Sequence, residues 1–311
     1  MSLDPNVSVD PLAPTIFHES WWLDIATEGL YSVAEVSENG KVVGRLPYFL
    51  FKKMGVAIVD LPTITHFLGP AVISAKPLRR LEITKELIDK LPPVSALYIK
   101  CHRDVQDVIA FQSAGYSTSV QFTHEIHPQP TDVLWKTVQA KTRRVIRRAS
   151  ECHSVSTGND PLAFMQFYRK NIEDRGKTNS IDINICTRLI QACLEGDRGR
   201  IFEARDQAGN LASAIFCAWD KSSSYYILTA RHPSAHLGAT SLLVWEAISD
   251  AAKRGLMFDF DGFDGEGGAR FAYNFTSTVA PRFIAMRASG PLSLIRAAKS
   301  VFRKQRNFFF K

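Results

Sequence analysis

The 311-residue sequence lacks the features that mark disulfide-linked, zinc-binding and membrane-spanning proteins. Its five cysteines, at positions 101, 152, 186, 193 and 217, include no CxxC pair. An odd number of scattered cysteines predicts neither a disulfide framework nor a zinc cluster, so we expect no metal. No apolar run approaches the roughly 20 residues that a membrane-spanning helix needs.

Targeting signals and familiar catalytic motifs are also missing. The first fifteen or so residues contain Asp4, Asp10 and several prolines, a composition unlike that of a secretory signal or a membrane anchor. No P-loop, zinc-ligand spacing or serine-triad motif is present. The sequence therefore predicts a cytoplasmic protein that does not use these chemistries.

What the chain does contain is typical of a soluble globular protein. Apolar residues make up 45% and charged residues 22% of the sequence, and the length predicts one or two domains. The 38 Lys and Arg residues outnumber the 31 Asp and Glu residues, which gives a net charge of +7. This excess of positive charge favours an anionic partner without identifying one.

The spacing of apolar residues predicts two halves with the same order of elements. The first half is expected to contain a helix (17–29), a hairpin around Asn39-Gly40 (31–37 and 41–52), a strand (56–61), a helix (78–91), a strand (94–100), a helix (104–114) and a strand (116–126). The second half is expected to contain helices (132–150, 160–174, 181–195), a short strand (154–157), a meander (200–205, 211–219, 225–230), a helix (238–254), a strand (256–260), a helix (269–275), a strand (280–288) and a last helix (291–308). We therefore expect an α+β protein with two modules, residues 1–130 and 131–311.

The stretch from Tyr225 to Phe275 organises the second half. A buried strand, a turn and a helix starting near Gly238 are followed by a second buried strand and a glycine-rich loop at 261–268. A helix that begins after a glycine-bearing turn offers unpaired N–H groups to a phosphate. We expect an activated donor or cofactor to bind here.

Several segments together resemble a known family: 17–23, 141–149, 168–169 with 175–176, 238–251, and 258–262 with 270–271. Their order is similar to that of the GNAT acyltransferases and, more narrowly, of the FemAB-like branch, in which two GNAT-like modules stand in tandem. The resemblance implies two mixed, mostly antiparallel sheets flanked by helices. It also implies transfer of an acyl or aminoacyl group from acyl-CoA or aminoacyl-tRNA to an amine of a cell-wall or polysaccharide precursor.

The sequence departs from the family pattern at several places. CoA-dependent GNAT proteins usually carry Arg or Gln where this chain has Ala235, and Gly or Ala where it has Thr240. FemAB-like members often have Lys where this chain has Ala272. These departures leave open a catalytically silent module that binds polyanions or a membrane surface. The absence of a long coiled-coil arm favours acyl-CoA over tRNA, whereas the altered loop favours the opposite.

The resemblance and the helix start together suggest donor-binding residues. Gly238, Ala239 and Thr240 open the helix, and Arg231 precedes the turn. Arg270 follows a Gly-Gly pair and would hold a phosphate or carboxylate bidentately, or else pair with a nearby acidic residue.

Four residues are candidates for catalysis. Asp259 and Asp261 end a buried strand on one face, where they would orient or deprotonate an amine, or else cap the loop. Tyr226 would protonate the leaving group unless it is a core residue. His232 would act as a base unless it is an exposed loop residue. No cysteine has an activating context, so we expect direct transfer without a covalent enzyme intermediate.

Two further regions are candidates for substrate binding. Arg143, Arg144 and Arg147 belong to a basic helix suited to tRNA, a nucleotide-sugar diphosphate or lipid head groups, or to a solvated face. By analogy Trp21, Trp22 and His66 would line a cleft between the modules, although buried tryptophans are commonly core residues. The basic helix at 291–308 would touch a membrane beside a lipid-linked acceptor, or pack on the second module.

Overall fold

The computed structural model describes residues 10–53, 55–174, 176, 181–262, 265–276 and 278–288. They form two compact units, which we call the first module (residues 9–121 and 281–311) and the second module (residues 122–280) for their described parts. The chain passes from one unit to the other within strand β6 (Ser117–Ile126) and again within β12 (Val279–Ala288). Strands β6 and β12 are therefore each divided between the two modules.

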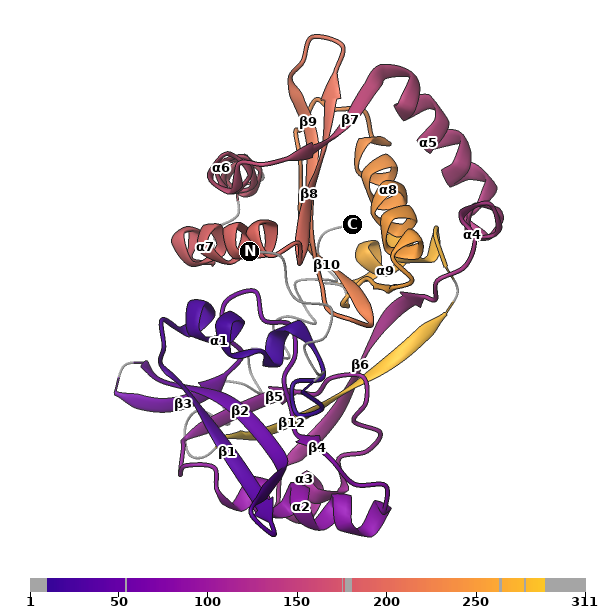
Figure 1. The fold of residues 1–311 in the computed structure, drawn as a ribbon. Coiled ribbons are helices and arrows are strands. Elements are labelled where there is room, and N and C mark those ends of the chain that lie inside the picture. The colour runs from indigo at the N-terminus through magenta and orange to yellow at the C-terminus, as the bar shows by residue number, and fades with distance from the viewer. Residues whose placement is uncertain are drawn as a thin grey trace. The chain divides into compact units, whose positions relative to one another are not determined.

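The first module has the strand order β1-β2-β3-β5-β12, with β4 paired to β2 (Figure 1). All of these pairs are antiparallel except β3 with β5. Helices α2 and α3 cover one face, and their apolar residues share one core with the sheet. The elements are η1 (Ile16–His18), α1 (Ser20–Thr27), β1 (Tyr31–Glu38), β2 (Lys41–Lys53), β3 (Val56–Asp60), β4 (Ala71–Val72), α2 (Pro77–Asp89), β5 (Ala96–Lys100) and α3 (Ile109–Ser113).

The second module has the order β6-β11-β10-β9-β8-β7, in which only β10 and β11 are parallel. Helix α8 and helix α5 lie on one face of this sheet, and α6 and α7 lie on the other (Figure 1). The elements are α4 (Thr131–Thr137), α5 (Ala140–Cys152), β7 (His153–Gly158), α6 (Pro161–Glu173), α7 (Ile183–Glu195), β8 (Gly199–Asp206), β9 (Leu211–Trp219), β10 (Ser223–Arg231), α8 (Ala239–Lys253), β11 (Met257–Asp259) and α9 (Glu266–Tyr273).

Local sequence signals explain several element boundaries. Asn39 and Gly40 have φ values of 49° and 76°, which is the left-handed pair that a two-residue hairpin turn requires. Asp160 caps α6 by accepting a hydrogen bond from the Ala163 N–H at 2.9 Å. The predicted α+β architecture, two modules with mixed, mostly antiparallel sheets flanked by helices, is confirmed.

Two predicted helices differ from the structure. The single helix expected over 132–150 is two helices, α4 and α5, because Val138 between them is extended, with φ −61° and ψ 134°. The helix expected over 104–114 is only the short α3, preceded by a loop in which Asp107 accepts a hydrogen bond from the Ile109 N–H. The expected helix at 291–308 lies outside the described residues. In the described part of the chain, no helix is both long and apolar enough to cross a membrane.

Candidate functional site

The carboxyl ends of the parallel strands β10 and β11 define the candidate site in the second module. The two strands pair at three positions, the last of which joins Tyr225 to Asp259. Beyond Tyr225, β10 continues to Arg231 through an irregularity between Tyr226 and Leu228, where the register against β9 shifts. A ligand site in an open α/β sheet typically lies beyond the carboxyl ends of parallel strands, and bulges often re-aim residues there.

Asp259 anchors the turn that follows β11. The residue is fully buried, and its Oδ1 accepts hydrogen bonds from Thr123 Oγ1 and from the Asp261 N–H, both at 2.7 Å. Thr123 Oγ1 in turn accepts a hydrogen bond from the Gly262 N–H at 2.8 Å. Asp259 therefore fixes the backbone of the loop, as the capping alternative expected.

Asp261 sits immediately beyond, with a strained backbone. It is 7% exposed and has a φ of 56°, in the left-handed region that costs a non-glycine residue on the order of 1 kcal/mol. The hydrogen bond from its N–H to Asp259 helps to hold this conformation. Because strained non-glycine residues cluster at functional sites, Asp261 stays the stronger candidate of the two carboxylates.

The two tyrosines of β10 have different surroundings. Tyr225 is fully buried, and its hydroxyl donates to Asp220 Oδ2 at 2.6 Å. Tyr226 packs against Phe258 and Phe260, with ring centroids 6.4 and 6.0 Å away. Burial raises the pKa of both hydroxyls above the usual value, and the Asp220 charge raises the pKa of Tyr225 further. Both therefore remain protonated near neutral pH and can donate a hydrogen bond.

The loop between β10 and α8 holds Arg231 and His232. Arg231 Nη1 donates to the Ala235 carbonyl at 3.0 Å, which closes the loop on itself. His232 Nδ1 lies 2.8 Å from Ser234 Oγ on the exposed side of the loop. Arg231 thus shapes the turn, and His232 is accessible to a ligand.

The start of α8 is tightly packed. A Cβ on Gly238 would lie 2.7 Å from Val145 Cγ1 and 2.8 Å from the Val145 carbonyl, so glycine lets α5 approach the helix. Ala239 is fully buried, and Thr240 Oγ1 lies 3.0 Å from Ser213 Oγ. The side chains of Ala239 and Thr240 therefore pack into the module, and what the helix start offers an anion is backbone N–H groups and its positive dipole end.

A pocket of about 320 Å³ adjoins this loop. Three of its lining residues are histidines, His153, His232 and His236, and the His153 and His236 ring centroids are 6.2 Å apart. Hydrogen bonds from Asn210 lower the pKa of Asp206, which also lines the pocket. The described residues contain no group of three or more His, Cys, Asp or Glu side chains arranged to hold a metal ion. The pocket therefore suits a polar or phosphorylated ligand.

The remaining basic candidates have varied partners. Arg270 pairs with Glu266 at 2.5 Å, and both side chains are more than three-quarters exposed. Arg143 donates to the carbonyls of Trp135, Lys136 and Val138, so its charge caps the end of α4. Arg147 lies over the Trp135 ring at 5.8 Å, whereas Arg144 is exposed. Arg144 and Arg147 thus remain accessible on the outer face of α5.

The candidates from the first module are mostly packed. Trp22 is fully buried, and its Nε1 donates to Thr65 Oγ1 at 2.9 Å. Trp21 is less buried and donates to Glu19 Oε2 at 2.7 Å. Burial, and secondarily the charge of Lys100, lowers the pKa of His66 to about 3. Trp22 is therefore a core residue of the first module, as the alternative expected.

Sequence reasoning missed three residues of the network around β10 and β11. Thr123 lies 136 positions before Asp259 in the chain, so no local pattern connects them. Asp220 could have been suspected, because it directly precedes the turn into the Tyr225 strand. The third is Tyr225, which precedes Tyr226 in the same apolar strand, so the strand pattern alone does not distinguish the two.

The fold of the second module, with its parallel strand pair, is that of the GNAT acyltransferases. Residues 136–273 match the family model of the acetyltransferase (GNAT) domain. The second module therefore resembles a GNAT domain in sequence, and the chain as a whole shares the fold of FemX. No curated protein matches the sequence significantly.

Three solved structures share this fold over most of their length. FemX superposes with a TM-score of 0.65 at 14% identity, covering 85% of this chain and 90% of that one. The C-terminal domain of a putative lysylphosphatidylglycerol synthetase from Agrobacterium fabrum gives 0.57 at 12% identity, covering 89% and 94%. L-PGS from Bacillus licheniformis gives 0.57 at 13% identity, covering 89% and 90%. At such identities the likeness extends to the fold alone.

Proposed function

We propose that the protein is an N-acyltransferase that forms an amide by direct transfer from acyl-CoA or aminoacyl-tRNA to an amine. The observation that carries the proposal is the parallel pair of β10 and β11, which ends at Tyr225 and Asp259 inside a segment that matches a GNAT domain. An acyl donor would lie beyond these strand ends, with its phosphates toward the loop at 231–238 and its histidine-lined pocket.

The chemistry assigned to these residues is simple. The amine nitrogen attacks the donor carbonyl, the amide bond forms, and the thioester or ester bond breaks. Asp261 would accept the proton that the nitrogen loses, and Asp259 would hold the Asp261 backbone in place. Tyr226, which burial keeps protonated, would donate a hydrogen bond toward the leaving sulfur or oxygen and stabilise its developing negative charge. His232 is the alternative base.

The acceptor is proposed as an amine of a cell-wall, polysaccharide or lipid-linked precursor. The resemblance to the FemAB-like branch favours a cell-wall precursor, and the name of the lysylphosphatidylglycerol synthetases describes an aminoacyl group joined to a phospholipid. Such acceptors would place the protein in the cytoplasm, with peripheral contact to a membrane.

A thermal-shift titration with coenzyme A, acetyl-CoA and aminoacyl-tRNA tests the donor. A ligand at about 100 times its dissociation constant stabilises the folded state by roughly 2.7 kcal/mol. We expect a dose-dependent rise with one donor class that Gly238→Trp removes and that Leu162→Trp, at an exposed position of α6, retains. A rise that both variants retain would place the donor elsewhere, and no rise with any donor would contradict the proposal.

A second candidate function is a silent module that binds polyanions. Arg144 and Arg148 are exposed on α5, and neither guanidinium has an ion-pair partner among the described residues. Ala272, at the place where FemAB-like members often carry Lys, is buried in the core and supplies no charge. Binding of tRNA without any turnover would favour this function.

A further inference from the structure

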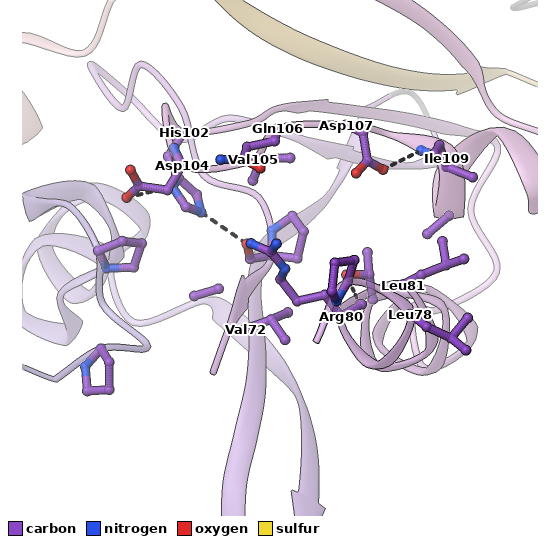
Figure 2. Close-up of a pocket in the computed structure, with 17 residues that line it drawn as sticks. Val72, Leu78, Arg80, Leu81, His102, Asp104, Val105, Gln106, Asp107 and Ile109 are labelled. Carbon is purple, nitrogen blue, oxygen red and sulfur yellow. Dashed lines mark hydrogen bonds and ion pairs between the residues drawn. The ribbon is translucent and has the colours of Figure 1, made fainter. Parts of the chain in front are cut away.

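A second pocket lies within the first module, apart from the proposed donor site. Its volume is about 430 Å³, which is within the usual range for small-ligand sites. It lies between helix α2, strand β4 and the loop at 101–108 that precedes α3 (Figure 2). Nothing in the proposed transfer reaction uses these residues.

Two adjacent arginines of α2 differ in their partners. Arg79 forms ion pairs with Glu38, Glu82 and Glu86 at 2.5, 3.0 and 3.1 Å. Arg80 lines the pocket, and its guanidinium forms no ion pair or hydrogen bond with the described residues. Figure 2 shows the Arg80 side chain reaching from α2 toward the loop that carries His102. A half-buried cation without a counter-ion is suited to an anionic group of a ligand.

Two carboxylates line the same pocket. Asp104 lies 3.7 Å from His102 Nδ1, and its side chain is 66% exposed. One oxygen of Asp107 accepts the hydrogen bond from the Ile109 N–H at 3.1 Å. His102 itself is buried, and its Nε2 lies 3.0 Å from the Pro70 carbonyl. The pocket therefore presents one guanidinium and two carboxylates to a ligand.

The walls between these charges are apolar. Leu78 and Ile109 line the pocket and are 68% and 51% exposed, although both are large apolar residues. Val72, Leu81 and Val105 complete this surface. Covering these side chains would remove apolar area from water, which favours binding by roughly 25 cal/mol per Å². The ligand should therefore carry an apolar body as well as charges.

We infer that this pocket binds a small zwitterion with an apolar side chain, such as an apolar amino acid or a short peptide. Its carboxylate pairs with Arg80, and its ammonium group pairs with Asp104 or Asp107. A simple carboxylate would be repelled by the two acidic side chains, and a simple amine would leave Arg80 unpaired. Only a ligand with both charges matches both features of the site.

Isothermal titration of the full-length protein tests this inference. The probes are L-leucine and leucyl-leucine, at concentrations up to about 10 mM, which covers millimolar dissociation constants. Two analogues lack one charge each: 4-methylpentanoate lacks the amine, and isoamylamine lacks the carboxylate. We expect saturable binding of at least one zwitterion and at least about tenfold weaker binding of both analogues.

Variants locate the site. Arg80→Met keeps the apolar stem and removes the charge, so it should weaken zwitterion binding about tenfold or more. Arg79→Gln, one residue away in α2, is the matched control and should bind as the wild type does. Hydrogen exchange of the wild-type protein should show protection within 77–84 and 101–110 on binding. This measurement does not depend on whether any variant folds. Equal binding of 4-methylpentanoate, protection elsewhere only, or no saturable binding of either zwitterion would each overturn the inference.

Discussion

In the described residues, each module has one pair of parallel strands joined through a helix, β3–α2–β5 in the first and β10–α8–β11 in the second. In the first module the pairing of β3 with β5 ends at Val59 with Leu97. After β3 the chain comes back to β5, and Leu68 forms an isolated parallel bridge with Cys101, one residue past the end of β5. The Leu68 N–H donates to the Lys100 carbonyl at 2.8 Å, and the His102 N–H donates to the Leu68 carbonyl at 2.9 Å. Backbone thus occupies the place beside the end of β5.

In the second module, carboxylate side chains lie beside the end of β11, which corresponds to β5 of the first module. The connection from β10 to α8 is short and turns away at Arg231. Beside the end of β11 lie Asp259 and Asp261, which are bound through Thr123 and the loop backbone. The same order of elements therefore yields a backbone-filled position in one module and carboxylates in the other. This difference supports placing the proposed transfer chemistry in the second module, the one that matches the GNAT family.

The largest effect should come from separating the modules at the predicted boundary. Residues 1–130 lack β12, which pairs with β5 from Ile284–Lys100 to Ala288–Ala96. The fragment would expose the edge of β5 and lose the fully buried Ala285 from its core. We expect no cooperative unfolding transition for the fragment alone, measured by circular dichroism, and recovery on co-expression with residues 131–311. A monomeric fragment 1–130 with a cooperative transition would contradict this expectation.

The next largest effect should come from the anchor of the β11 turn. Asp259→Ala leaves the Thr123 hydroxyl and the Asp261 N–H without their buried acceptor. Because hydrogen bonds to charged groups are worth about 1.5–3 kcal/mol each, we expect a loss of about 3 kcal/mol in the free energy of unfolding. Urea denaturation measures the change, and Thr123→Val should cost about half as much. Equal stability of Asp259→Ala and the wild type would show that the turn does not depend on this carboxylate.

The order of elements was predictable because it depends on local patterns. Apolar periodicity gave most helices and strands, and Asn39-Gly40 gave the hairpin, since both signals lie within a few residues of the structure they specify. The break at Val138 was missed, because neither proline nor glycine marks it and Arg143 stabilises it from a distance of five residues. The local pattern was thus sufficient for the elements but not for every boundary.

Contacts between distant segments were not predictable in the same way. The bond from Thr123 to Asp259 and the packing of Val145 on Gly238 join residues about a hundred positions apart or more. A strand pattern fixes which face is apolar but not which strand pairs beside it. The pairing of β6 with β11 of the second module, and of β12 with β5 of the first, was therefore also missed. The sequence placed most candidate residues near β10, α8 and β11, and their catalytic and binding roles stay predictions.

Acid should weaken the first module through two of its histidines. Burial, and secondarily His102, lowers the pKa of His18 well below its usual value, and burial lowers the pKa of His66 to about 3. Both stay neutral in the folded state, whereas the unfolded chain takes up protons near pH 6.5. Stability is therefore full above about pH 6.5 and falls progressively toward pH 3, by up to about 1.4 kcal/mol per pH unit for each histidine.

Denaturation at several pH values, followed by tryptophan fluorescence, measures this slope. His66→Gln should reduce it, because the substituted residue no longer titrates. His127→Gln, which removes an exposed histidine, is the matched control. Identical slopes for His66→Gln and the wild type would contradict the assignment of acid sensitivity to His66.

Two glycines of the second module should respond in opposite directions to alanine. Gly238→Ala forces a Cβ to within 2.8 Å of the Val145 carbonyl, so we expect a loss of about 2 kcal/mol and a shift of α5. Gly267→Ala meets no atom within 4 Å and lies within α9, so it should stabilise the protein by about 0.5–1 kcal/mol. Thermal unfolding of both variants measures the contrast. Stabilisation by Gly238→Ala would show that α5 does not depend on this close approach.

The smallest effect on stability, and the clearest on binding, concerns the basic helix α5. Arg144 and Arg148 are exposed, so replacing both by Ala should leave the free energy of unfolding nearly unchanged. If they contact phosphates of an RNA, the slope of log affinity against log salt should fall by about 1.5, because each contact contributes about 0.7–0.9. Arg143→Ala is the control with the opposite pattern: it removes the cap of α4, so it should lower stability by about 1 kcal/mol and leave the salt slope unchanged. Fluorescence anisotropy with uncharged tRNA at several salt concentrations measures both variants. An unchanged salt slope in the double variant would remove Arg144 and Arg148 from any polyanion surface.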